Sequence, residues 1–126
     1  MKLTDTIAAI STPIGEGGIS VIRLSGDHAL SVIEKIYFKD KDQNKKFSIS
    51  ETDSHTVHFG YIFDDTQLLI DEVLITIFKN PHSYTGEDVI EISSHGGTYI
   101  AQKIQKFLKT LFNISSLVTS PVISPR

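Results

Sequence analysis

The sequence predicts an α+β fold, with β-strands and two helices combined in a single globular domain. Several short segments are apolar or alternate between apolar and polar residues, which is typical of strands. Two longer segments repeat apolar residues at helical spacing. The 126 residues, 40% of them hydrophobic, are enough to bury about two thirds of the unfolded surface in one core, so a second domain is not expected.

The first predicted strand, Thr6 to Ile10, is expected to end before Pro13, which has no N–H to donate to a sheet. The loop that follows, PIGEGG, is rich in glycine, which indicates either a tight turn or the close approach of a ligand. It lacks the GxxxxGK(S/T) spacing of a phosphate-binding loop, and no lysine-serine pair follows another glycine cluster. A nucleotide triphosphatase formed by this chain alone is therefore not expected.

The second predicted strand, Gly18 to Leu24, carries Arg23 at the end of an apolar row. Two interpretations are open for this arginine. It is either a solvated residue at a strand end, or a planar cationic group that binds a carboxylate of the ligand or of the protein. After this strand, Ser25-Gly26-Asp27 is predicted to cap a helix that continues to about Tyr37.

Residues 39–46 carry charges of both signs without periodicity, which predicts an exposed loop with no function of its own. The next predicted strand runs from His55 to Phe63. His55 and His58 are expected to lie on opposite faces of it, so they cannot share one metal ion.

A turn at residues 64–67 is predicted to join this strand to another, Leu68 to Lys79, in a hairpin. Both faces of the second strand are largely apolar. We therefore expect one face to meet the helices and the other to be covered by more of this chain or by a second copy of it. Asp71 interrupts the apolar pattern, either as a solvated residue near the turn or as a ligand-binding carboxylate.

The side chains best suited to binding or chemistry concentrate in residues 81–97, PHSYTGEDVIEISSHGG. Turn residues, carboxylates, a histidine and two glycines lie close together there. The alternation from Asp88 to Ser94 predicts a strand in which Glu91 lies on the face opposite two isoleucines. A carboxylate within an apolar strand needs a partner. Gly96-Gly97 then open a helix, and the free N–H groups at a helix N-terminus suit an anionic or polar ligand.

The last predicted helix, Gly97 to Phe112, has an apolar stripe and is expected to cover the sheet. Residues 114–126 contain two prolines and several serines without an amphipathic period. They are predicted to be an irregular, extended or frayed tail to a domain formed by residues 1–113.

Composition excludes some classes of function. The chain has no cysteine, which excludes disulfides, a thiol nucleophile and cysteine metal sites. The lack of a signal peptide or a long apolar run fits a soluble cytoplasmic protein that does not enter a membrane. The net charge is −3, so the domain as a whole lacks the positive charge expected of a nucleic-acid-binding module, and any RNA is expected to be held by other parts or partners.

Two long motifs, DTIAAISTPIGEGGISVIRLSG near the start and PHSYTGEDVIEISSHGG later, closely resemble the N-terminal domain of the MnmE family of tRNA-modification GTPases, also called TrmE. The likeness covers residues 5–112, and the segments SHTVHFGYIFD and IDEVLITIF between the motifs also resemble the family. Because both motifs occur in the family's order and spacing, the resemblance is far more specific than a single glycine motif.

The resemblance implies a single β-β-α-β-β-β-α folate-binding unit, similar to those in the glycine-cleavage T protein and dimethylglycine oxidase. Those proteins carry two units in one chain, whereas the MnmE domain supplies one and completes the fold by homodimerisation. This agrees with the second layer that the two-sided apolar strands require.

The resemblance also implies a ligand and partners. The ligand is a one-carbon tetrahydrofolate, the 5-formyl or 5,10-methylene form, whose one-carbon unit is used to build an aminomethyl group on the wobble uridine of certain tRNAs. The partner of a full-length MnmE protein is MnmG, which uses FAD and NADH, and tRNA is reached indirectly through that complex.

Folate chemistry assigns roles to residues of this sequence. A pterin presents an amide N–H beside an exocyclic amine, and a carboxylate can accept both. Glu91 is the first choice for that carboxylate and Asp71 the second, while Arg23 is expected either to orient the carboxylate or to pair with the glutamate tail of the folate. No catalytic or metal-binding residue is expected. The other expected contacts are an aromatic ring, hydroxyl groups and the helix N-terminus, from Tyr84, Thr85, Ser94, His95, Gly96 and Gly97.

The chain departs from the family pattern at three places. Glu16 stands where the glycine loop usually reads GRGG, and Ser94 stands where many members carry cysteine. The ending VTSPVISPR does not match the family motif PGEFTKRAF, so we expect an isolated or truncated first domain without the GTPase module. The alternative function is a dimerisation module with a defective folate site. An enzyme acting alone, such as an aminomethyltransferase, is disfavoured because no nucleophile-base pair is recognisable.

Overall fold

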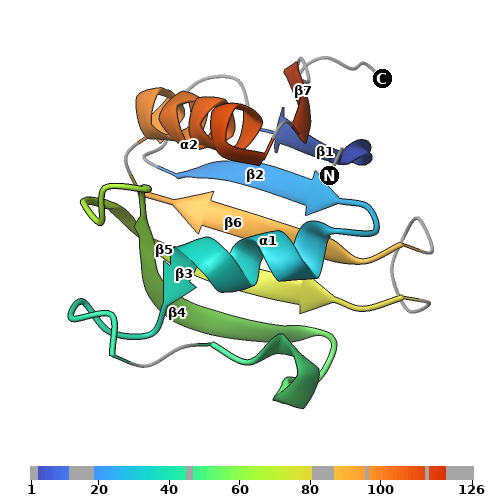
Figure 1. The fold of residues 1–126 in the computed structure, drawn as a ribbon, viewed down its shortest axis with the longest axis horizontal. Coiled ribbons are helices and arrows are strands. Elements are labelled where there is room, and N and C mark those ends of the chain that lie inside the picture. The colour runs from blue at the N-terminus through green and yellow to red at the C-terminus, as the bar shows by residue number, and fades with distance from the viewer. Residues whose placement is uncertain are drawn as a thin grey trace.

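The computed structural model describes residues 3–11, 19–44, 47–80, 87–95, 97–112 and 114–118. This part of the chain forms strands and two α-helices, with several strands between the helices (Figure 1). The α+β class predicted from the sequence is confirmed. The elements are β1 (Leu3–Ser11), β2 (Ser20–Ser25), α1 (Ala29–Ile36), β3 (Tyr37–Phe38), the 3-10 helix η1 (Ile49–Glu51), β4 (Thr56–Phe63), β5 (Leu69–Phe78), β6 (Val89–Ser94), α2 (Gly97–Phe112) and β7 (Ile114–Val118).

The described strands form one sheet in the order β3-β4-β5-β6-β2-β1-β7. All neighbouring pairs are antiparallel except β1 and β7, which are parallel. Figure 1 shows α1 and α2 on the same side of this sheet, with α2 over the β1 and β2 end and α1 over its middle. The sheet therefore has one face covered by helices, and the opposite face is called the open face below.

The core lies between the helices and the covered face. Burial alternates along β2, where Ile22 and Leu24 are fully buried, because successive side chains of a strand point to opposite faces. Each such isoleucine or leucine contributes roughly 1.5–3 kcal/mol when it leaves water. The other buried apolar residues of the central strands and of the helices are Ile75, Ile77, Ile90, Ile92, Ala29, Val32, Ile33, Ala101, Ile104 and Leu108.

The open face also carries apolar side chains, but no element of the described chain covers it. Val57 and Phe59 on β4 are 60% and 49% exposed, and Leu74 on β5 and Ile7 on β1 are each 39% exposed. Cross-strand register places these residues on the face opposite the core. The second apolar face expected from the sequence is thus present, and none of the described elements covers it.

The predicted hairpin is confirmed as β4 and β5, which pair antiparallel. Asp64 organises its turn, because its Oδ1 accepts hydrogen bonds from the backbone N–H groups of Thr66 and Leu68, at 2.8 and 2.9 Å, and from the Thr66 hydroxyl at 2.6 Å. The Thr66 hydroxyl and then the backbone bond from Leu68 hold the pKa of Asp64 below its usual value of 3.8. Gln67 adopts a φ of 68°, the left-handed conformation that completes the turn.

The predicted start and end of the first helix are wrong. Ser25 belongs to β2 and pairs with Val89, so it cannot cap a helix, and the N-cap position is His28, which makes no side-chain cap hydrogen bond. At the other end Tyr37 leaves the helix with extended backbone and joins β3. Tyr37 therefore pairs with β4 as a strand residue, although its spacing from the other apolar residues is helical.

The predicted irregular tail is also wrong for part of its length, because residues 114–118 form β7. This strand pairs in parallel with β1, with Ala8 opposite Ser116 and Ile10 opposite Val118. The backbone of β1 gains a neighbour on its outer edge because α2 runs back along the sheet and returns the chain beside it (Figure 1). Such a short parallel strand leaves no alternating pattern in its own sequence.

Candidate functional site

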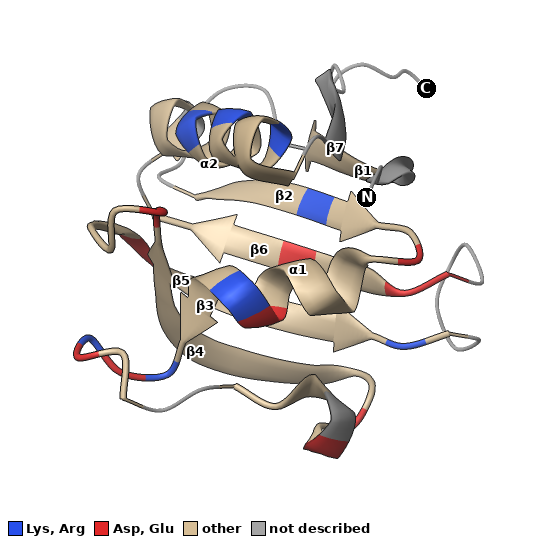
Figure 2. Ribbon diagram, in the orientation of Figure 1, with Lys and Arg blue, Asp and Glu red and all other residues tan. Residues whose placement is uncertain are grey.

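The central feature of the open face is an ion pair between two neighbouring strands. Arg23 on β2 and Glu91 on β6 lie directly opposite each other in the register of the sheet. The Arg23 Nη2 and Nε atoms donate to Glu91 Oε2 at 2.6 and 3.0 Å. Figure 2 shows the basic position of β2 beside the acidic position of β6, near the middle of both strands. The sequence prediction that Arg23 serves a carboxylate is therefore consistent with this pair.

The pairing leaves part of the Glu91 carboxylate available. Both donors of Arg23 reach the same oxygen, Oε2, and Oε1 has no hydrogen-bond partner among the described residues. The Glu91 side chain is 24% exposed and the Arg23 side chain 42%. A planar guanidinium that contacts one carboxylate oxygen through two N–H groups holds that oxygen in place. The carboxylate can therefore accept further N–H donors.

Small and apolar residues surround the ion pair on the open face. Thr76 on β5 lies opposite Glu91, and Ala9 on β1 lies opposite Arg23. Val57 continues this row beyond Thr76. These side chains offer a partly apolar surface beside the ion pair to a flat ligand.

Two other predicted site residues lie on the covered side of the sheet. Asp71 shares the alternation of the buried Val73, and its Oδ2 accepts a hydrogen bond from the backbone N–H of His95 at 2.8 Å. Ser94 is fully buried, and its hydroxyl donates to the carbonyl of Ser20 at 3.5 Å. The structure therefore does not bring Asp71 or Ser94 to Glu91. Asp71 instead fixes the junction between β6 and α2.

The remaining predicted residues lie at that junction or outside the described chain. His95 is exposed, with its Nδ1 atom 3.4 Å from the carbonyl oxygen of Glu72. Gly97 begins α2 with a φ of +73°, a conformation that favours glycine. Tyr84, Thr85 and Gly96, and the glycine loop at 12–18 with Glu16, lie outside the described residues.

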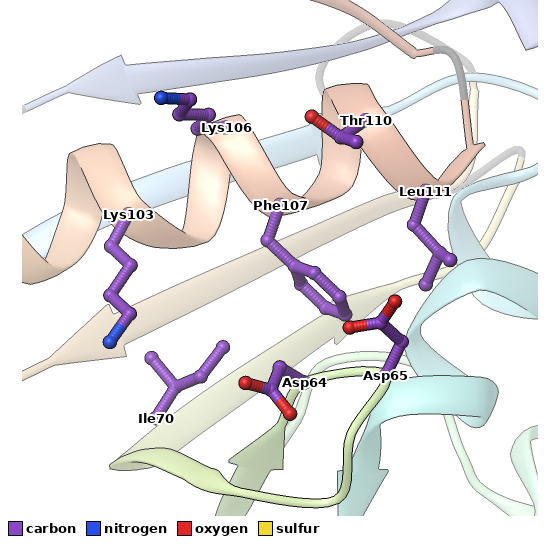
Figure 3. Close-up of a pocket in the computed structure, with 8 residues that line it drawn as sticks. All are labelled: Asp64, Asp65, Ile70, Lys103, Lys106, Phe107, Thr110 and Leu111. Carbon is purple, nitrogen blue, oxygen red and sulfur yellow. The ribbon is translucent and has the colours of Figure 1, made fainter.

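A cavity that the sequence did not predict lies on the other side of the sheet, between the β4–β5 turn and α2 (Figure 3). Its volume is about 450 Å³. Asp64 already accepts three hydrogen bonds within its turn, whereas Asp65, the second carboxylate of this cavity, is exposed. No local pattern indicates that a turn and a helix forty residues apart will meet. The lining residues are Asp64, Asp65, Ile70, Lys103, Lys106, Phe107, Thr110 and Leu111.

The two histidines of the β4 segment lie apart. The His55 ring packs edge-on against Phe78, and the His58 ring against Phe47, each with 5.1 Å between centroids. Burial, and then the nearby Lys39, lower the pKa of His58 below its usual value of 6.5. The described residues include no group of three or more histidine or acidic side chains that could hold a metal ion. Within those same residues, no helix is long and apolar enough to cross a membrane.

Comparison with known proteins identifies the family to which the chain is similar. A family described as "GTP-binding protein TrmE N-terminus" matches residues 6–116 of the chain. The chain belongs to this TrmE N-terminal family. The resemblance seen in the two sequence motifs is therefore confirmed. The match includes both Arg23 and Glu91, and it extends into β7, beyond the boundary at residue 113 predicted from the sequence.

Curated relatives of this TrmE N-terminal domain are tRNA modification GTPases named MnmE. The chain is 52% identical over 101 residues to the protein of Lachnoclostridium phytofermentans. The aligned residues make up 80% of this chain and 21% of that relative. It is 50% identical over 106 residues to the protein of Acholeplasma laidlawii, covering 83% and 22% of the two chains. The protein of Listeria innocua is 44% identical over 104 residues, which make up 82% of this chain and 21% of that relative. The chain thus spans about a fifth of the length of the curated relatives it matches.

Proposed function

We propose that this chain binds a one-carbon tetrahydrofolate on its open face and forms a homodimer, as the folate-binding part of a system that modifies the wobble uridine of tRNA. The names of its relatives, tRNA modification GTPase MnmE, support the process. The single observation that carries the ligand proposal is the Glu91 carboxylate, which Arg23 holds through one oxygen while the other has no hydrogen-bond partner among the described residues.

The lone pairs of this carboxylate suit a pterin. A carboxylate offers about four acceptor positions on its two oxygens. Arg23 uses two of them, both on Oε2. Oε1 then remains for the adjacent amide N–H and exocyclic amine of the pterin ring. When bound, the folate would supply the one-carbon unit, in either its 5-formyl or its 5,10-methylene form.

The apolar residues of the open face support the dimer. Val57, Phe59 and Leu74 expose large apolar side chains on two neighbouring strands. A contiguous apolar face of this kind is usually covered by a partner, and closed homodimers are the commonest partners. Covering the face would also remove water from the ion pair and strengthen its hydrogen bonds to a ligand.

The other members of the proposed system follow from the family. In the full-length context the partner is an MnmG-like FAD protein, and tRNA is reached through it. We propose no catalytic residue on this chain, which holds the folate and presents it to that partner. GTP hydrolysis is not assigned to it.

Thermal unfolding in the presence of 5-formyltetrahydrofolate tests the ligand proposal. A ligand at about 100 times its Kd stabilises the folded state by about 2.7 kcal/mol, so the melting temperature of the wild type should rise. Glu91→Gln keeps the shape of the side chain but removes its charge, and it should abolish the rise. Glu51→Gln, at an exposed glutamate of η1, is the matched control and should keep it.

Two results would overturn the ligand proposal. One is a wild type that shows no rise at ligand concentrations far above micromolar. The other is an unchanged rise in Glu91→Gln. Flat folate calorimetry together with a dimer in sedimentation would instead identify the alternative, a dimerisation module with a defective folate site.

A further inference from the structure

The helix α2 has a charge that is opposite to that of the rest of the chain. It contains Lys103, Lys106 and Lys109 and no acidic residue. Because the whole chain carries a net charge of −3 and α2 contributes +3, the remainder carries −6. The net charge of the whole domain therefore does not reveal that α2 is basic.

The three lysines lie on the exposed part of α2, where Figure 3 shows Lys103 extending toward the β4–β5 hairpin and Lys106 away from it. All are exposed, whereas Ala101, Ile104 and Leu108 face the core. Lysines three residues apart are neighbours on a helix, and the row of three extends about 9 Å along its axis. Figure 2 shows these basic positions repeating along α2. A phosphate chain that runs along the helix could contact each of them.

A shallow hollow lies on the same surface. Its volume is about 290 Å³, and it is lined by Tyr99, Gln102, Lys103 and Lys106. The Tyr99 side chain is 71% exposed, which is unusual for an aromatic ring on an otherwise amphipathic helix. An exposed ring offers a stacking surface for a base, and the lysines beside it suit the attached phosphates.

We propose that the outer surface of α2 binds RNA, with Tyr99 stacking on an unpaired base and Lys103, Lys106 and Lys109 contacting phosphates. The hollow with its aromatic ring favours a nucleic acid over an acidic protein, which would need only the charges. The choice of RNA rests on the proposed function, to which it adds a direct contact beside the one made through the FAD protein. Asp64 and Asp65 line a cavity together with Lys103 and Lys106 and partly offset their charge there, whereas neither aspartate lines the hollow beside Tyr99.

Fluorescence anisotropy of the full chain with a labelled, unmodified tRNA anticodon stem-loop tests this proposal. The triple variant Lys103→Glu, Lys106→Glu and Lys109→Glu should weaken binding at least about tenfold at about 50 mM salt. The triple variant Lys35→Glu, Lys39→Glu and Lys41→Glu changes the net charge equally at exposed positions outside α2 and should have a much smaller effect. Three phosphate contacts to a single strand predict a slope of about −2 for log K against log salt, and the α2 variant should lose most of it.

Substitutions at Tyr99 separate stacking from charge. Tyr99→Ala should weaken RNA binding about tenfold, whereas Tyr99→Phe, which keeps the ring, should bind as the wild type does. Both should keep the wild-type melting temperature because the side chain is exposed.

Four results would overturn the proposal: no RNA binding by the wild type, equal losses in the two triple variants, no loss in Tyr99→Ala, or competition by polyaspartate as effective as competition by RNA. The melting-temperature rise with 5-formyltetrahydrofolate should persist in the α2 variant. Failure of RNA binding with an intact folate response would therefore remove this inference alone, and a lost folate response with intact RNA binding would remove only the proposed function.

Discussion

At the scale of single residues, the ion pair of Arg23 and Glu91 is better suited to binding than to stability. Both side chains retain contact with water, at 42% and 24% exposure. Ion pairs between accessible side chains typically contribute about 0–1 kcal/mol, because water and salt screen them. Selection for folding alone therefore gives little reason for a glutamate at this position in an apolar strand.

We predict that Glu91→Gln and Arg23→Ala each lower the free energy of unfolding by less than about 1 kcal/mol. Urea denaturation of the two single variants and the double variant measures this, and the coupling energy between them should also be small. A loss of more than about 3 kcal/mol in either variant would instead assign the pair a structural role.

Gly60, on β4, is expected to tolerate replacement poorly. A Cβ atom at this position would lie 2.5 Å from the carbonyl oxygen of Phe38 and 2.5 Å from the ring of Tyr37. Gly60→Ala should therefore destabilise the protein by roughly 1–3 kcal/mol through overpacking. Gly97→Ala is the comparison, since nothing lies within 4 Å of its Cβ position and only its φ of +73° opposes a side chain.

The measurement for this pair of glycines is chemical denaturation. Gly97→Ala should lose about 1 kcal/mol, the usual penalty for a left-handed residue with a side chain. An equal or larger loss at Gly97 than at Gly60 would show that the Tyr37 ring moves aside freely.

At the scale of elements, the β4–β5 turn should make stability depend on acid. The hydrogen bonds of the Asp64 carboxylate lower its pKa below 3.8, so the folded state binds this proton less readily than the unfolded state. The stabilisation is present above that usual pKa and is lost as pH falls through the lowered value.

Asp64→Asn should therefore be less stable than the wild type at pH 7, and the difference should shrink as the pH falls below about 4. Urea denaturation at several pH values measures this. Asp65→Asn, at the exposed neighbour, is the control and should follow the wild type throughout. A constant difference between Asp64→Asn and the wild type at all pH values would contradict this role for the carboxylate.

The sequence predicts elements whose pattern is local. The alternation of β2 and β6 is enough to place Arg23 and Glu91 on a face opposite the core, as the structure has them. It cannot tell that Asp71 lies on the other face from Glu91, because that depends on how β5 and β6 pair. The strand β7 is missed for the same reason, since its partner β1 lies more than 100 residues away.

At the scale of the whole molecule, the proposed assembly depends on the open face. We predict a dimer in sedimentation velocity, and Val57→Lys with Phe59→Lys should convert it to a monomer by placing charges on the apolar face. Leu68→Lys is the matched control, because Leu68 is 66% exposed and lies in the hairpin turn. A wild-type monomer at high concentration, or a dimer that survives both lysines, would contradict a dimer through this face.

At the same scale, the sheet separates the open face from the helix-covered side of the domain, where the cavity and the basic surface of α2 share Lys103 and Lys106. The open face holds the ion pair, and the cavity beside the β4–β5 turn and the basic surface of α2 lie on the helix-covered side. Because the proposed folate site and the proposed RNA surface are on opposite sides of the sheet (Figure 1), a ligand on one does not block the other.

The most direct test of the central claim is a crystal structure of the chain with 5-formyltetrahydrofolate. We predict density for the pterin on the open face, with its amide N–H and exocyclic amine within hydrogen-bonding distance of Glu91 and with Arg23 still paired to the carboxylate. Density in the cavity between the β4–β5 turn and α2, with none beside Glu91, would contradict this assignment.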